Sequence, residues 1–171
     1  MSLGVDRFES IPHAFFDRVA NAPTDLVFSQ ALLPSATSSD EREPRQRRTA
    51  TYAEVGTRVR QIATFLRSAG MEKGARVAIL SQTRPEWMEA DLGILAAGGI
   101  AVSIYQSLPA HDVGFILFDS GTSFVFAENQ DQENKLLELC FAHTFDIAAT
   151  EERAACKINL SLRRIIAIEP V

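Results

Sequence analysis

The sequence contains few of the residues that mark specialised protein classes. Its 171 residues include two cysteines, Cys140 and Cys156, which form no CxxC pair. Two such thiols make neither a disulfide framework nor a cysteine metal motif, so we expect a reduced, cytoplasmic setting. No apolar run approaches the roughly 20 residues that a transmembrane helix requires. These absences exclude the small disulfide-rich class and predict no membrane span.

Basic charge is also scarce. The chain has 17 Lys and Arg against 22 Asp and Glu, a net charge of −5. Phosphate backbones are bound by basic surfaces, so this balance argues against nucleic acid as a partner. The 46% hydrophobic and 23% charged content is typical of a soluble globular protein, and the length suits one domain with a real core.

Phosphate-binding and nucleophile motifs are missing. No GxGxxG follows a strand, no GxxxxGK[ST] occurs, and no GxSxG elbow is present. Gly98-Gly99 lies between a helix and a strand, whereas a phosphate site forms where a strand leads into a helix. We interpret this pair as a helix terminator that permits close packing. The sequence therefore predicts no catalytic, cofactor-binding or metal-binding residue within residues 1–171.

The remaining polar candidates have simpler structural interpretations. The three histidines lack metal-ligand spacing. His111 and Asp112 are adjacent, and neighbours on a helix point different ways, so we interpret them as an exposed helix start. Glu86, Glu89 and Asp91 fall in the first turns of a helix. They could act as an acid–base pair, but we favour interaction with the positive helix end.

Apolar periodicity and turn residues predict alternating helices and strands. Thr51-Tyr52-Ala53-Glu54 is a capping box that opens a helix ending at Gly70. The predicted elements that follow are strand Arg76–Leu80, helix Pro85–Ala97, strand Ile100–Ile104, a helix from Pro109 to Ser120, strand Ser123–Ala127, a helix from Asn129 to Cys140, and strand Arg164–Ile168. This order predicts an α/β fold with a doubly wound, mostly parallel sheet and helices on both faces.

The two flanking regions are less regular. Upstream we expect a helix from Ser10 to Asn21, a strand at Leu26–Leu33 and a mobile surface loop at Pro34–Arg48. Downstream, Ala142–Leu162 is too long for a bare loop in a compact domain.

Two further expectations concern the C-terminal third of the chain. Thr150 is a candidate cap for a short helix inside Ala142–Leu162. We also expect Phe141, Phe145 and Ile147 to expose apolar surface.

The order of these motifs resembles a known family. TYAEVGTRVRQIATFLRSAGMEKGARVAILSQTRPEWMEADLGILAAGGIAVSIYQSL, HDVGFILFDSGTSFVFAENQDQENKLLEL and LRRIIAIE occur in this order. They resemble the amino-terminal region of the AMP-forming acyl-CoA synthetases, and among these the long-chain fatty-acid–CoA ligases. One departure is Gln106, where the family more often has proline.

The resemblance implies an activity that residues 1–171 do not carry. A parent of this kind joins a fatty acid to coenzyme A, using ATP and Mg²⁺, through an acyl-adenylate. Its phosphate loop and C-terminal domain would follow Val171, so we expect the fragment to be inactive and its main partner to be the remainder of its own chain. A homodimer and a peripheral contact with the inner membrane face are compatible with the resemblance. The alternative is a stand-alone flavodoxin-like binding or interaction module.

Overall fold

A four-stranded parallel sheet forms the centre of the molecule. The computed structural model describes residues 8–31, 47–141, 145–147, 156–158, 160 and 162–169. The strands of this sheet are β3 (Arg76–Leu80), β4 (Ile100–Ile104), β5 (Phe124–Ala127) and β8 (Arg164–Ala167). Their spatial order is β4-β3-β5-β8, and each pairing is parallel. Successive strands are therefore added on one side of β3 first (β4) and then on its other side (β5 and β8), so the strand order reverses between β3 and β5.

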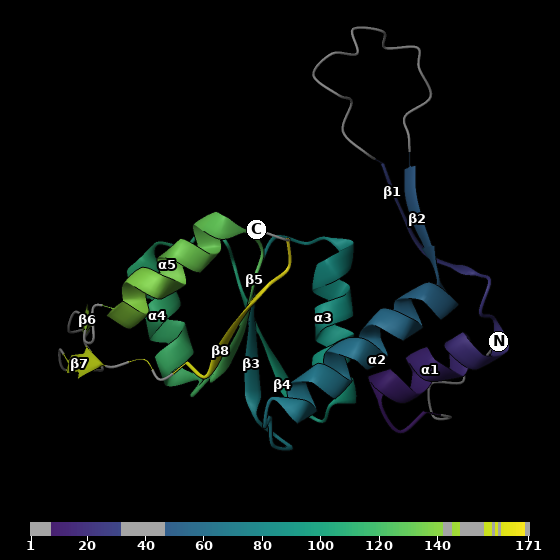
Figure 1. Cartoon of the computed structure of the whole chain (residues 1–171), viewed down its shortest axis with the longest axis horizontal. Coiled ribbons are helices and arrows are strands. Elements are labelled where there is room, and N and C mark those ends of the chain that lie inside the picture. The colour runs from purple at the N-terminus through teal and green to yellow at the C-terminus, as the bar shows by residue number, and fades with distance from the viewer. Residues whose placement is uncertain are drawn as a thin grey trace, which may run out of the picture.

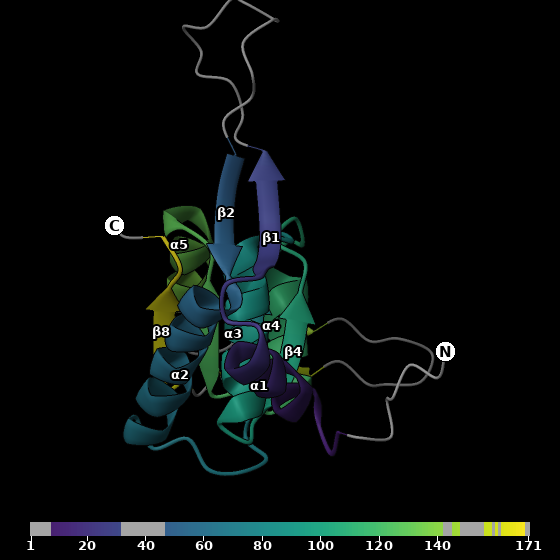
Figure 2. The ribbon, with the colours of Figure 1, turned by 90° about the vertical axis from the view of Figure 1, so that its right-hand side faces the viewer.

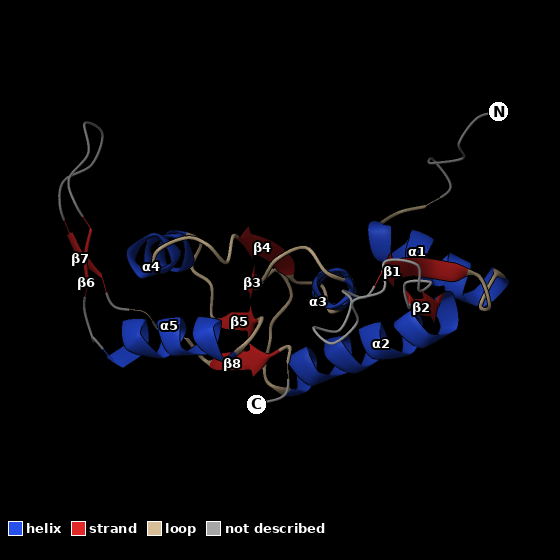
Figure 3. Cartoon of the chain, turned by 90° about the horizontal axis from the view of Figure 1, so that it is seen from above, coloured by secondary structure: helices blue, strands red, loops and turns tan. Residues whose placement is uncertain are grey.

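Helices cover both faces of this sheet. Helices α2 (Tyr52–Ser68) and α3 (Pro85–Ala96) lie on one face, and α4 (Ala110–Asp119) and α5 (Gln130–Phe141) on the other (Figures 1 and 3). Right-handed crossovers account for this division: the step from β3 to β4 runs opposite to the steps that lead to β5 and β8. The prediction of a doubly wound α/β fold is confirmed.

Two apolar cores form because every side of β3 and β5 is covered. Apart from Arg76 at the start of β3, their residues are buried without alternation, as expected for inner parallel strands. Ile79, Phe124 and Phe126 pack towards α2 and α3, while Leu80 and Val125 pack towards α4 and α5. The sheet is therefore held from both sides.

A smaller unit precedes the sheet. Helix α1 (Ile11–Asn21) packs beside α2, and β1 (Leu26–Ala31) pairs antiparallel with β2 (Arg47–Thr51). This β-ribbon projects from the body (Figure 2). Phe15 of α1 is buried with Val55 and Val59 of α2, which joins this unit to the rest.

The predicted loop Pro34–Arg48 is wrong at its C-terminal end. Arg47 and Arg48 belong to β2, and residues 34–46 lie outside the described residues. The Arg47 side chain donates to Ser29 Oγ and to the Ser29 carbonyl oxygen, at 2.7 Å each. Pairing with a distant strand outweighs a local composition that is typical of a loop.

The ends of the central helices are fixed by local chemistry. The Thr51 hydroxyl accepts from Glu54 N at 3.3 Å, and Glu54 Oε2 accepts from Thr51 N at 2.8 Å, which confirms the capping box. The backbone N–H of Thr51 and, at 2.9 Å, its hydroxyl both donate to Glu54 Oε2, and these two hydrogen bonds lower the pKa of Glu54. Gly70 and Gly98 end α2 and α3 with φ of 87° and 82°, a region that favours glycine.

Removal of the cap provides a test of this local control. We expect Thr51→Ala to lower the free energy of unfolding by about 1 kcal/mol, because N–H groups of the first turn lose their acceptor. Thr57→Ala, on the same helix, is the matched control, since the Thr57 hydroxyl bonds only to the Ala53 carbonyl in the preceding turn. Urea denaturation of both variants measures the difference. An equal cost for the two substitutions would contradict a capping role.

The region after α5 contains one feature that the sequence did not predict. Strands β6 (Phe145–Ile147) and β7 (Cys156–Ile158) pair antiparallel. Phe141 is 74% exposed, in agreement with the expectation for that residue. The side chains of Phe145 and Ile147, and the helix expected at Thr150, lie outside what the structure describes.

Candidate functional site

The carboxyl ends of β3, β5 and β8 meet at one edge of the sheet. Because parallel strands end together, the residues that follow them are brought close although they are far apart in sequence. Six polar residues gather there, and we call them the carboxyl-edge cluster. They are Arg48, Gln82, Arg84, Glu86, Glu128 and Glu169.

Glu128 is the buried centre of this cluster. It directly follows β5 and its side chain is 2% exposed. Its carboxylate accepts from Gln82 N at 3.1 Å and from Gln82 Nε2 at 2.7 Å. The backbone N–H of Glu128 donates to the Leu80 carbonyl at 3.1 Å. Glu128 thus ties the end of β5 to the turn after β3, at the point where the strand order reverses.

Arg84 is the cation that these carboxylates share. It is the N-cap residue of α3 and is 19% exposed. Its guanidinium donates to Glu86 Oε2 at 2.8 Å, to Glu128 Oε1 at 3.4 Å, and to Glu169. Burial acts to lower the pKa of Arg84, but its hydrogen bonds with Glu169 and Glu86 outweigh burial and raise it. Arg84 therefore stays charged. It connects the ends of β3, β5 and β8 to the start of α3.

Glu86 links the cluster to the projecting ribbon. It bonds to both Arg84 and Arg48, and Arg48 belongs to β2. Burial acts to raise the pKa of Glu86, while hydrogen bonds from Arg84, its own backbone and Arg48 lower it overall. Glu86 is thus an ionised bridge between two cations. Its position in the first turn of α3 fits the expected helix-end interaction, but the arginine pairing was not predicted.

The other two acids of α3 differ from Glu86. Glu89 is buried and pairs with Arg58 of α2, with 2.8 Å between Glu89 Oε1 and Arg58 Nη2, and this contact raises the pKa of Arg58. Asp91 is half-buried, and burial raises the pKa of its carboxyl group. Of the three acids only Glu86 lies in the first turn of α3, so Glu89 and Asp91 lie beyond the turn where a helix-end interaction is effective. Glu89 instead fixes α3 against α2.

A groove lies next to the cluster, between α2 and β8. Its volume is about 390 Å³. Most of the residues that line the groove are apolar and come from α2, from α3, from β5, and from β8 and the residue that follows it. The Arg58–Glu89 pair forms one wall. The apolar lining residues are Ile62, Phe65, Ala90, Phe126, Ile166, Ala167 and Ile168. We call this feature the α2–β8 groove.

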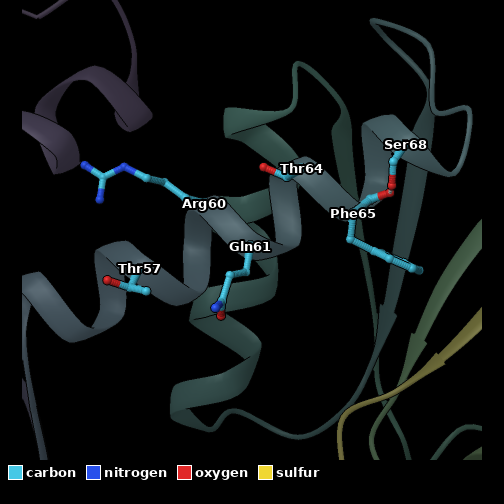
Figure 4. A pocket seen from close by; sticks show the side chains of 6 residues that line it. All are labelled: Thr57, Arg60, Gln61, Thr64, Phe65 and Ser68. Atoms are coloured by element: carbon cyan, nitrogen blue, oxygen red, sulfur yellow. Dashed lines mark hydrogen bonds between the residues drawn. The ribbon is translucent and has the colours of Figure 1, made fainter.

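A second hollow lies on the outward face of α2 (Figure 4). Its six lining residues all come from this one helix, so it is a shallow surface rather than a cleft between elements. Arg60 points towards α1, where its guanidinium lies 4.7 Å from the centroid of the Phe16 ring. Phe65 points towards the sheet and also lines the α2–β8 groove. This face offers no converging polar groups.

Two further sites singled out in the sequence are the His111–Asp112 pair at the start of α4 and the Gly98-Gly99 pair after α3. His111 and Asp112 do not point apart as expected: His111 Nε2 lies 3.1 Å from Asp112 Oδ1. His111 is exposed and Asp112 is half-buried, and both lie in the first turn of α4. The interpretation of Gly98-Gly99 is confirmed, because a Cβ at Gly99 would lie 3.2 Å from the Ala75 carbonyl oxygen.

The cluster can position elements, and its charges are mutually paired. Two arginines face three carboxylates, so the charged groups of the cluster already bind one another. Within the described residues, no group of three His, Cys, Asp or Glu side chains could hold a metal ion. None of the helices in this part of the chain has the length and apolar character needed to cross a bilayer. The prediction that residues 1–171 contain no catalytic residue stays a prediction.

The fold defines a doubly wound α/β domain, and a family comparison identifies its class. The family model described as AMP-binding enzyme matches residues 18–161. The chain belongs to the AMP-binding enzyme family.

Individual relatives agree with this assignment, and a solved structure shares the fold. The long-chain-fatty-acid–CoA ligase FadD15 of Mycobacterium bovis is 39% identical over 89 residues, 52% of this chain and 15% of that protein. Bacitracin synthase 3 of Bacillus licheniformis is 30% identical over 129 residues, 74% of this chain and 2% of that protein. The crystal structure of the N-terminal domain of FACL13 from Mycobacterium tuberculosis matches with a TM-score of 0.65 and 23% identity, over 94% of this chain and 34% of that chain. The chain thus spans a small part of FadD15 and of Bacitracin synthase 3.

Proposed function

We propose that this chain is the N-terminal α/β part of an ATP-dependent long-chain fatty-acid–CoA ligase. The observation that carries the proposal is the family match over residues 18–161, together with 39% identity to a long-chain ligase over 89 residues. The continuous parallel sheet with helices on both faces supports it. The family match also argues against the flavodoxin-like stand-alone module.

The proposed reaction has two steps, each with a defined exchange of bonds. A fatty-acid carboxylate oxygen attacks the α-phosphorus of ATP, a carboxyl–phosphate bond forms, and pyrophosphate leaves. The sulfur of coenzyme A then attacks the acyl carbon, a thioester forms, AMP leaves, and the thiol proton passes to solvent. Mg²⁺ and cationic side chains neutralise phosphate charge in such reactions. In our proposal these groups bind to the polypeptide that follows residue 171, in a cytoplasmic enzyme.

The resemblance to Bacitracin synthase 3 defines the competing activity. That relative is matched over more of this chain, though at lower identity, and its name is that of a bacitracin synthase. Adenylation of an amino acid would use the same first step with a different carboxylate. Substrate class therefore separates the two candidates.

The experiment compares carboxylate substrates in the polypeptide encoded by the same reading frame through and beyond Val171. We expect pyrophosphate release with palmitate, and CoA-dependent formation of AMP and a thioester. Residues 1–171 alone serve as the control, with no turnover expected. Release of pyrophosphate with amino acids but not with fatty acids would contradict the proposal. Turnover by residues 1–171 alone would contradict its assignment of the chemistry to later residues.

A further inference from the structure

Glu169, just beyond β8, is held both by its backbone and by its side chain. The pairing with β5 continues through Ile168, whose N–H donates to the Ala127 carbonyl at 2.8 Å. The Glu169 N–H then donates to the Glu128 carbonyl at 3.1 Å, and the Glu169 carboxylate accepts from the guanidinium of Arg84. These two attachments together set the direction in which the chain leaves the sheet.

The Arg84 guanidinium is a rigid attachment point for Glu169. Arg84 is the N-cap residue of α3, and its side chain is only 19% exposed. It donates to Glu86 Oε2 at 2.8 Å and to Glu128 Oε1 at 3.4 Å. Glu128 is in turn fixed by two hydrogen bonds from Gln82. The guanidinium is thus held by α3 and by the ends of β3 and β5, independently of Glu169.

The three carboxylates around Arg84 differ in how much they need it. The side chain of Glu128 is 2% exposed and that of Glu86 19%, whereas that of Glu169 is 47% exposed. An unpaired carboxylate is costly when it is buried, but water solvates it at an exposed site, where an ion pair contributes little to stability. Folding therefore requires the contact with Glu169 least of the three. The main physical effect of this contact is to restrict where Glu169 lies.

The chain leaves β8 at the edge of the sheet where doubly wound folds bind ligands. The end of β8 and the start of α3 lie at this same edge (Figure 1). In such folds the ligand site lies beyond the carboxyl ends of the strands, where the strand order reverses. Here that point is between β3 and β5, and the side chains of Gln82 and Glu128 already bond to each other there. Groups that react at this edge are therefore expected from other parts of the polypeptide.

We propose that Arg84 is a positioning residue for adenylation: by holding Glu169, it sets the direction in which the polypeptide continues from β8 to the groups that bind ATP and the carboxylate substrate. The inference rests on the proposed function, which assigns those groups to the polypeptide after residue 171. Arg84 touches neither substrate. A displacement of about 1 Å at the reacting atoms can cost roughly 100-fold in rate, so a distant anchor affects the reaction without binding a substrate.

Single-turnover adenylation of palmitate tests this role in the longer polypeptide from the same reading frame. With Glu169→Ala, we expect the rate constant to fall by on the order of 10-fold, while the amount of palmitoyl-adenylate formed per protein molecule stays unchanged. The KM values for ATP and palmitate should change by less than about 2-fold, because the anchor affects alignment rather than binding. A substitution that only destabilises the fold lowers the amount of product per molecule instead of the rate constant.

Asp25→Ala is the matched control. Asp25 is 57% exposed and pairs with Arg18 at 2.7 Å, so this substitution also removes an exposed contact with an arginine. Asp25 precedes β1 and lies outside the carboxyl-edge cluster. The rate constant of this variant should stay within about 2-fold of that of the unmodified protein.

A third variant tests whether Arg84 and Glu169 act together. Arg84→Lys keeps a cation beside the buried Glu128, but an ammonium lacks the planar fork that binds several carboxylates at once. It should slow the single-turnover step as Glu169→Ala does. The double variant should be no slower than the slower of the two single variants. Rate losses that multiply in the double variant would overturn the proposal that Arg84 acts through Glu169.

The possible results separate this inference from the proposed function. In a longer protein that adenylates palmitate, an unchanged rate constant for Glu169→Ala would overturn the positioning role alone. A loss of product per molecule without a change in rate, or an equal loss of rate in Asp25→Ala, would overturn it as well. If the longer protein adenylates amino acids in place of palmitate, a slower reaction in Glu169→Ala would support the positioning role and overturn the proposed function.

Discussion

Gly93→Ala should lower the free energy of unfolding by about 2–3 kcal/mol, because α2 and α3 approach each other too closely there for a methyl group. A Cβ at Gly93 would lie 2.4 Å from Ile62 Cγ2 and 2.7 Å from Ile62 Cβ. The Ile62 Cβ is bonded to the backbone of α2 and cannot rotate away, so relief of this contact requires a shift of the helix itself. The expected loss is net of the roughly 1 kcal/mol that alanine gains over glycine in a helix.

Gly56→Ala is the matched control for this helix contact. Gly56 is also buried in a helix, but its Cβ would meet the branched end of Val19 at 2.9 Å. A side-chain end on α1 can shift, so we expect a change of about 0.5 kcal/mol or less. Chemical denaturation compares the two variants, and Ile62→Ala should recover part of the loss in Gly93→Ala. Equal free energies of unfolding for Gly93→Ala and the unmodified chain would contradict the claim that α2 and α3 pack too closely for a methyl group at residue 93.

Arg84→Met should be destabilising by about 3 kcal/mol near neutral pH, because it removes the cation shared by a buried carboxylate and two others. Glu128 would remain 2% exposed without that cation, and Glu86 and Glu169 would also lose their contacts with it. Methionine keeps much of the side-chain volume, so the loss reports on charge rather than on packing. Thermal and urea unfolding at several pH values provide the measurement.

The dependence of this effect on pH has a defined sign. The folded-state pKa of Glu86 lies below its ordinary 4.5, so its stabilising contribution is present above about pH 4.5 and is lost as pH falls through the lower, folded value. Arg84→Met removes part of that contribution, so the cost of the substitution should shrink in acid. Arg18→Met is the control: the Arg18–Asp25 pair is exposed, and its loss should cost roughly 0.5 kcal/mol or less. Similar losses for Arg84→Met and Arg18→Met would contradict a central role for Arg84.

Local signals predicted most of the sheet and its helices. Thr51 and Glu54 cap a helix by contacts three residues apart, and Gly70 and Gly98 end helices by their own backbone conformation. Such features depend on neighbouring residues, which the sequence shows directly. The β-ribbon was only half predicted because the pairing of Arg47 with Ala31 depends on residues on either side of a long segment.

The carboxyl-edge cluster was missed because its contacts join distant parts of the chain. Arg84 and Glu128 are 44 residues apart, and Arg84 and Glu169 are 85 apart. Yet a usable signal was present, since Gln82, Glu128 and Glu169 each follow a predicted buried strand closely. Parallel strands bring such residues to one edge, so a search of strand ends would have grouped them. The pairing of particular oxygen and nitrogen atoms still depends on tertiary packing.

The strand order has a consequence for synthesis on the ribosome. The central strand β3 is synthesised before β4. Strand β5 follows only after α4, and β8 only after α5. Because each parallel pairing closes a long connection, the nascent chain keeps apolar edges of β3 and β5 uncovered while translation continues. Docking of β8 is the step that first covers the outer side of β5. We therefore expect nascent chains stopped before residue 164 to bind chaperones more strongly than those that have released residue 169.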